Sequence, residues 1–213
     1  MELKVYRGDG TATDRTVALD ASVFGIEPND HAIWLDVKAL QANARQGTHK
    51  AKERGENAHS TRKLYRQKGT GGARAGSAKS PTRKGGGTIF GPRPRDYRQF
   101  VNKKTKQLAR RSALSYKAQE DGAIRLVDSF TSETPSTKTF ASLLKGMDVL
   151  GRRVLILTDG YAPTVVRSVR NLDRVAIRPA AEASTLDIMQ AHVVVLAEGA
   201  LGALSQTLGT QKA

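Results

Sequence analysis

The chain has 213 residues, no cysteine, and 35 Lys and Arg against 20 Asp and Glu, which gives a formal net charge of +15. The length suffices for one sizeable core, and the lack of cysteine excludes a disulfide scaffold, a thiolate nucleophile and a zinc ribbon. No apolar run approaches the roughly 20 residues that span a bilayer, and residues 1–16 lack the apolar segment of a secretory signal. We therefore expect a cytoplasmic protein without a membrane partner.

The N-terminal part predicts a strand followed by a helix. Residues 3–6 alternate in polarity, as expected of a short strand. The apolar positions of residues 31–45 share one helical face: Ile33, Val37, Leu40 and Ala44. Asn29 or Asp30 is the expected N-cap of this helix, and Gly47 is its expected stop.

A strongly basic segment follows. Residues 45–106 carry 18 Lys or Arg and three acids, hence +15, while the other 151 residues hold 17 of each sign and are neutral. The segment also holds ten of the 20 glycines, and only five of its 62 residues are Leu, Ile, Val or Phe. Such a composition cannot offset its own ordering entropy, so we expect it to need an anionic partner to become ordered.

Residues 47–98 show neither helical nor strand periodicity, which predicts one long extended loop. A structureless stretch of this length is either a disordered, solvated linker or a functional loop. Helices are predicted on both sides of it, and the N-terminal part is too small to fold alone. We therefore interpret residues 1–46 and 99–213 as one globular domain and residues 47–98 as an excursion from it.

The remainder predicts a helix and then an α/β alternation. The helix begins near residue 102 and ends at Gly122, with an apolar face toward a core and a basic face outward. The outward residues are Lys103, Lys106, Arg110 and Lys117. Strands are expected at residues 123–127, 153–157, 174–177 and 192–196. Helices are expected at residues 136–144, 163–170, 184–190 and 199–208, with a capping box from Ser184 to Asp187. The predicted fold class is α/β, a mainly parallel sheet with helices on both faces plus the long internal loop.

The fingerprints of catalysis are missing from the sequence. The segment that comes closest to the G-x-G-x-x-G turn of dinucleotide-binding proteins, residues 69–74, has Arg74 in place of the third glycine and no strand before it. There is no phosphate-binding loop of the Walker type, and no nucleophilic serine elbow. The four histidines lack the spacing of metal ligands: His31, His49, His59 and His192. We expect no enzyme, catalytic residue, metal or cofactor.

The basic segment instead has the features of an extension that threads through folded RNA. Its glycines let backbone N–H groups approach phosphates closely, and its many arginines offer planar charged groups. Planar rings suited to stacking on bases are interleaved with the charges: Tyr65, Phe90, Tyr97 and Phe100.

The motifs of this segment resemble the bacterial family of the fourth large-subunit ribosomal protein. They read RQKGTGGARAGS at residues 66–77, KSP at 79–81, GGG at 85–87, FGPRPRDY at 90–97 and NKK at 102–104. The helix end ARQGT at residues 44–48 and RSALS at 111–115 also match, so the resemblance covers the whole chain. Members of the family commonly have Pro-Trp where this chain has Leu64-Tyr65, Arg where it has Gly72, and an aromatic residue where it has Arg83.

The resemblance implies a structural constituent of the large ribosomal subunit whose loop penetrates 23S-type rRNA and supports early assembly. It implies that these residues bind rRNA: Arg45, Lys63, Arg66, Lys68, Arg74, Lys79, Arg83, Lys84, Arg93, Arg95, Arg98, Lys103 and Lys104. It implies a loop tip that lines the nascent-peptide exit tunnel, made of Gln67, Lys68, Gly69, Thr70, Gly71, Gly72, Ala73 and Arg74.

The implied partners are rRNA, neighbouring large-subunit proteins and the nascent peptide, without a homo-oligomer. The alternative is a free-standing RNA-binding regulator, for example of its own operon mRNA, because the same basic surface would serve both roles.

Overall fold

The computed structural model describes residues 1–130 and 134–209. The chain divides into two compact units, a globular unit of Met1–Gln41 and Phe100–Ala213 and a loop unit of Ala42–Gln99. Every buried residue of the two hydrophobic clusters belongs to the globular unit. The neutral, apolar-rich parts of the sequence therefore build the core.

The globular unit is built on a six-stranded mixed sheet in the order β2-β1-β3-β6-β4-β5. Its strands are β1 (Glu2–Tyr6), β2 (Ala12–Ala18), β3 (Ile124–Val127), β4 (Val154–Thr158), β5 (Val175–Pro179) and β6 (Val193–Ala197). Only the β1–β2 pair is antiparallel, and the other four pairings are parallel. This confirms the predicted α/β class.

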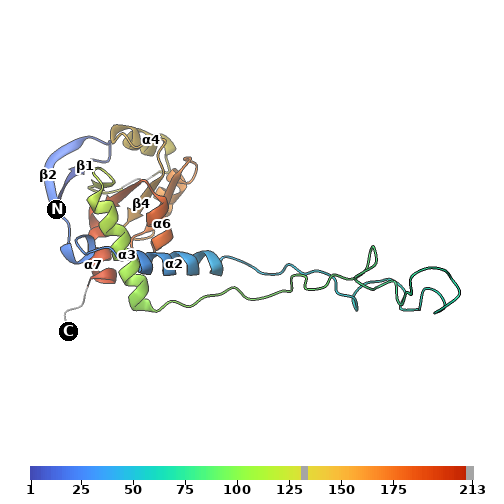
Figure 1. Ribbon diagram of the computed structural model, residues 1–213. Coiled ribbons are helices and arrows are strands. Elements are labelled where there is room, and N and C mark those ends of the chain that lie inside the picture. The colour runs from blue at the N-terminus through green and yellow to red at the C-terminus, as the bar shows by residue number, and fades with distance from the viewer. Residues whose placement is uncertain (131–133, 210–213) are drawn as a thin grey trace. The chain divides into compact units, whose positions relative to one another are not determined.

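Helices cover both faces of the sheet (Figure 1). The first face packs on α1 (Ala21–Phe24), α3 (Lys103–Gln119), α6 (Thr185–Gln190) and α7 (Glu198–Leu208). The second packs on α4 (Thr137–Gly146) and α5 (Pro163–Val169). The alternation of side chains along β6 explains this division, because Val194 and Leu196 face the first layer while Val193 and Val195 face the second.

Two N-terminal elements were not predicted, namely β2 and α1. β2 is an edge strand without a single buried residue, so its sequence ATDRTVA lacks the apolar alternation of a half-buried strand. α1 is only four residues long, too short for helical periodicity. Both elements form because neighbouring groups complete them, β1 for the strand and the cap Asp20 for the helix.

The helix α2 (Asp30–Asn43) differs from its prediction in its end and its buried face. Asn29 accepts a hydrogen bond from the N–H of Ala32 at its start, but the helix ends at Asn43, before the expected stop at Gly47. Its buried residues are Ala32, Ile33, Asp36 and Ala39. Of the predicted face only Ile33 is buried; Asp36, which was not predicted, is buried and accepts a hydrogen bond of 2.6 Å from the Thr185 hydroxyl.

The prediction for α3 was wrong at Lys117, and the helix ends at Gln119, three residues before the expected Gly122. Lys117 was expected on the outward face, yet it is 9% exposed. Its ammonium lies 3.0 Å from the Glu120 carboxylate, and this ion pair lets the long side chain lie against the protein. The four C-terminal strands and the helices between them lie within two residues of their expected bounds, and Ser184 and Asp187 form the expected capping box.

The N-cap of α1 gives the globular unit a pH dependence. The Asp20 carboxylate accepts hydrogen bonds from the N–H of Ser22 and the hydroxyl of Ser205, and these bonds hold the pKa of Asp20 below its usual range. Because this pKa is lowered in the folded state, the stabilisation is complete above the pKa of the unfolded chain. It is lost as the pH falls through the folded pKa.

We expect Asp20→Ala to lower the free energy of unfolding at pH 7 by about 1 kcal/mol, the usual cost of a lost cap. The difference from the wild-type protein should shrink as the pH falls below about 4. Chemical denaturation at several pH values measures both effects. Asp20→Asn is the matched control, because it keeps a capping oxygen and removes the titration; a deficit of Asp20→Ala that is constant with pH would contradict this account.

Candidate nucleic-acid interface

The loop unit consists of two arms that run side by side and are joined by few hydrogen bonds (Figure 1). The N–H of Arg95 donates to the carbonyl of Gly47, and the N–H of Ala51 donates to the carbonyl of Pro92. Further along, Lys63 and Ser77 form an isolated antiparallel bridge. Since no helix or continuous ladder forms, most backbone groups of the arms remain available to a partner.

The base of the loop is closed by polar and aromatic contacts. The side-chain amide of Asn43 accepts from the N–H of Gln99 at 2.8 Å and donates to its carbonyl at 3.3 Å. Gly47 has a φ of +69°, and a Cβ there would lie 2.1 Å from the carbonyl oxygen of Arg95. Glycine is thus required for the two arms to meet at this point.

An arginine–tyrosine cluster lies beside this glycine. The guanidinium carbons of Arg45 and Arg95 lie 3.7 and 4.4 Å from the centre of the Tyr97 ring. The Tyr97 hydroxyl lies 3.4 Å from Nε2 of His49. The cation–π contacts hold two of the expected rRNA-binding arginines in fixed positions while their outer edges stay exposed.

The middle of the loop holds two of its three acids, and both are paired with cations. Lys50 pairs with Glu56, and Arg93 pairs with Glu53. The hydrogen bond from Lys50 and a weaker one from the N–H of Glu53 hold the pKa of Glu56 below its usual range. Glu56 therefore stays ionised at neutral pH, and the two ion pairs are neutral while Lys52 and Arg54 beside them remain unpaired within the described part of the chain.

The end of the loop is a turn ordered by its own side chains. The Tyr65 hydroxyl donates to the carbonyl of Ala73, and the Arg66 guanidinium donates to the carbonyl of Gly69 at 3.1 Å. The ammonium of Lys63 lies 2.6 Å from Oε1 of Gln67. These contacts draw residues 63–73 into a compact turn.

The structure places the sequence-predicted residues in both units. Eleven of the thirteen expected rRNA-binding residues belong to the loop unit, and Lys103 and Lys104 begin α3 of the globular unit. All thirteen are exposed except Lys79, which is half-buried. The eight expected tip residues lie together in the turn and are all exposed.

The thirteen side chains differ in whether they have a partner within the protein. Eight of them have no ion pair, side-chain hydrogen bond or ring contact within residues 1–130 and 134–209, namely Lys68, Arg74, Lys79, Arg83, Lys84, Arg98, Lys103 and Lys104. Arg93, Arg66 and Lys63 have partners inside the loop. The free cations are the ones best placed to meet phosphates.

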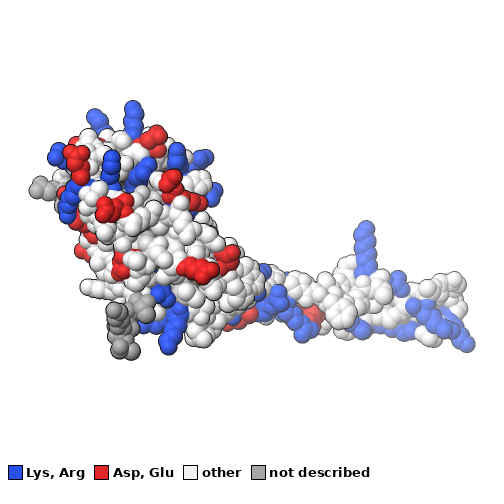
Figure 2. Space-filling model, turned by 60° about the vertical axis from the view of Figure 1, so that its left-hand side comes forward, with Lys and Arg blue, Asp and Glu red and all other residues white. Residues whose placement is uncertain are grey.

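Further exposed cations of the loop unit were not among the predicted residues. They are Lys50, Lys52, Arg54 and Arg62. They fall outside the motifs that carry the resemblance, but the charge count of the segment already included them. In total the loop unit has 15 Lys or Arg against three acids. Figure 2 shows these basic side chains gathered on the loop, whereas the globular unit carries both signs.

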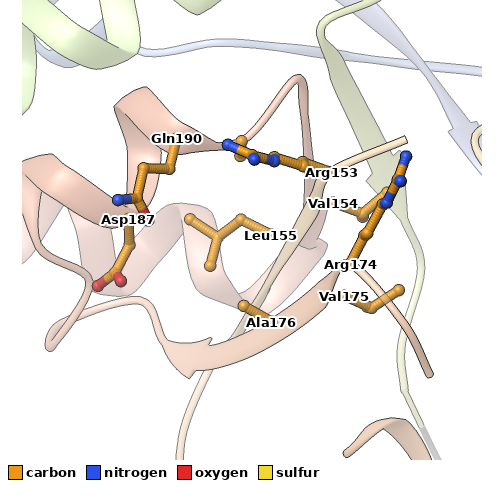
Figure 3. Close-up of a pocket in the computed structure, with 9 residues that line it drawn as sticks. Arg153, Val154, Leu155, Arg174, Val175, Ala176, Asp187 and Gln190 are labelled. Carbon is orange, nitrogen blue, oxygen red and sulfur yellow. The ribbon is translucent and has the colours of Figure 1, made fainter. Parts of the chain in front are cut away.

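The globular unit has a hollow of about 420 Å³ at the amino ends of β4 and β5 (Figure 3). Arg153, Arg174, Asp187 and Gln190 contribute its polar groups. Asp187 is engaged in the capping box of α6, and Arg174 donates to the carbonyl of Gly151. Nucleotides bind α/β sheets at the carboxyl ends of the strands, so this hollow lies at the wrong edge for such a site.

Neither a metal site nor a membrane span is found among the described residues. No group of three His, Asp or Glu is placed to hold a metal ion there. Within residues 1–130 and 134–209, no helix is both long and apolar enough to cross a membrane.

Comparisons with known proteins agree with the charge and motif arguments. The model of the ribosomal protein L4/L1 family matches residues 17–207. The large ribosomal subunit protein uL4 of Salinibacter ruber is 49% identical over 213 residues, which are 100% of this chain and 99% of that protein. The uL4 proteins of Bacteroides fragilis and Chlorobium luteolum are each 50% identical, over 98% of this chain and 100% of theirs.

The similarity spans both units, including the loop whose motifs first suggested it. A match of this extent and identity confirms the resemblance, and the chain belongs to the ribosomal protein L4/L1 family.

Proposed function

We propose that this chain is a structural constituent of the large ribosomal subunit and acts on the ribosome in the cytoplasm, without catalysing a reaction. The observation that carries this proposal is the loop unit, which has 15 cations, three acids and few internal hydrogen bonds. Its relatives bear the name of a large-subunit protein, which supports the same role.

The proposed ligand of the loop is 23S-type rRNA. Cations along both arms neutralise phosphates and release their counterions, so affinity falls as salt rises. The glycines and exposed backbone groups add close contacts to phosphate oxygens. The loop supports early assembly of the subunit, and Lys103 and Lys104 extend the contact to the start of α3. The globular unit meets neighbouring large-subunit proteins, and the chain acts as a monomer among them.

The turn at residues 63–73 is the proposed contact with the exit tunnel. It is the part of the loop where a compact turn, exposed glycines and the free cation Lys68 coincide. A polypeptide passing such a surface meets small, polar and positively charged groups. We therefore place the nascent peptide among the partners of this turn.

Sedimentation tests the proposal. The tagged chain, expressed in its own organism, should remain with the large subunit after a high-salt wash. A chain that leaves the subunit in the wash and travels with mRNA instead would support the free-standing regulator and overturn the structural role.

The same ribosomes test the tunnel contact. Because the chain has no cysteine, a single cysteine introduced as Thr70→Cys can carry a photo-crosslinker. We expect crosslinks from this position to a stalled nascent peptide. Lys138→Cys, at an exposed position of α4, is the matched control and should give none. Crosslinks from residue 70 to rRNA alone would contradict the tunnel contact.

A further inference from the structure

The arms of the loop are unequal in length near its middle, which forces three residues outward. The N–H of Thr88 donates to the carbonyl of Lys52, and the N–H of Ala51 donates to the carbonyl of Pro92, both at 3.0 Å. Two consecutive residues of one arm are thus tied to residues four apart on the other. The residues between these ties, 89–91, form a bulge.

The bulge presents two large apolar side chains to solvent. Phe90 is fully exposed and Ile89 is 59% exposed. Phe90 also has a φ of +52°, a left-handed conformation that is rare for a bulky residue. At Gly91 a Cβ would lie 2.6 Å from the Cβ of Ala51, so the closing glycine lets the arms stay tied beside the bulge. A strained backbone that holds an aromatic ring in water points to a ligand for that ring.

The two tyrosine rings of the loop unit are already engaged. Tyr97 contacts two guanidinium groups, and the Tyr65 hydroxyl is bonded to the carbonyl of Ala73. Both tyrosines are half-buried, unlike Phe90. Of the Phe and Tyr side chains in residues 42–99, Phe90 alone therefore has both faces free for stacking.

The charges near the bulge favour a nucleobase over an apolar protein pocket. Lys52 and Arg54 are exposed on the facing arm, and Arg93, which pairs with Glu53, follows the bulge on its own arm. An apolar pocket of a protein would have to accommodate these cations at its rim, whereas RNA surrounds an unpaired base with phosphates that match them.

We propose that Phe90 is a stacking site for an unpaired base of the rRNA, held out by the bulge of residues 89–91. This inference rests on the proposed rRNA binding and adds a contact that is independent of charge. Base–aromatic stacking should contribute about 5- to 100-fold to the affinity. Removing the ring should leave the salt dependence unchanged, because no cation is lost.

The experiment measures binding of the full chain to deproteinised large-subunit rRNA at several salt concentrations. Phe90→Ala and Phe90→Leu should both weaken binding by about 5- to 100-fold with the wild-type salt slope, while Phe90→Tyr should bind like the wild type. The leucine variant is decisive, because it keeps an apolar side chain of similar size and lacks a π face. Wild-type affinity of Phe90→Leu for naked rRNA would overturn the stacking site and favour a protein pocket.

A fluorescence measurement provides a second readout. Trp34 is the only tryptophan, so Phe90→Trp in a Trp34→Phe background reports on position 90 alone. We expect the rRNA to quench this tryptophan and inorganic polyphosphate, which has no bases, to leave it bright. Equal quenching by both would overturn the inference. If the wild-type chain itself fails to bind rRNA, the proposed function fails instead, so the two failures are distinguishable.

Discussion

Replacing residues 44–98 with a short Gly-Ser linker is expected to weaken binding to large-subunit rRNA by about a thousandfold or more at moderate salt. The replaced segment holds all 15 cations of the loop unit. The slope of log affinity against log salt should fall by roughly 0.7 to 0.9 for each phosphate contact that is lost. Titration of rRNA with the two proteins between low and moderate salt measures both quantities.

The same replacement should leave the globular unit folded. Neither hydrophobic cluster contains a buried residue from the loop unit, and Asn43 and Gln99 are already joined by two hydrogen bonds, so a short linker can close the gap. A cooperative thermal transition near that of the whole chain is the expected control result. An unfolded product would show that the globular unit needs the loop to fold. Unchanged rRNA affinity would show that the loop unit is not the rRNA-binding part.

Leu196→Ala is expected to lower the free energy of unfolding by about 2–5 kcal/mol. Leu196 is fully buried on β6, which lies between β3 and β4 near the centre of the sheet. Its removal leaves a cavity that the flanking strands cannot fill without breaking their pairing. Against a total stability of about 5–15 kcal/mol, such a loss brings the unit close to unfolding.

Denaturant titration of the variant measures the effect. Leu150→Ala is the matched control, since Leu150 is 53% exposed and its truncation should change stability by at most about 0.5 kcal/mol. Equal losses in the two variants would mean that the centre of the sheet does not dominate stability.

Nearly all strands and helices of the C-terminal α/β part were predicted from the sequence. Strands such as β4 and β6 are buried along their whole length, so their aliphatic runs have one interpretation. Edge elements were harder: β2 has no buried residue, and its pairing with β1 comes from backbone groups that leave no side-chain signal. The burial of Lys117 and of Asp36 was not predicted, because a local ion pair and a long-range hydrogen bond, not hydropathy, decide it.

The sequence predicted which segment forms the candidate interface and which residue types it contains, but not the contacts among its side chains. Charge and glycine content identified residues 47–98 as a loop, and four rings were expected to stack. Composition cannot tell that Tyr97 contacts Arg45 and Arg95, or that Tyr65 closes the turn, because these contacts depend on the register of the arms. The bulge at residues 89–91 is likewise a property of that register. The roles of the individual cations in rRNA binding stay predictions.

The pairing of β1 with β3 sets the order in which the protein can fold during its own synthesis. Val5 is aligned with Leu126, 121 positions later, so the first strand cannot be fixed until the whole loop has been made. The loop unit ends at Gln99, so at about 5–20 residues per second the complete loop precedes Leu126 by roughly 1–5 s. Throughout that interval its cations are carried on an unfolded chain, beside the RNA of the translating ribosome. The topology thus exposes the newly made loop to polyanions before the domain that carries it can be completed.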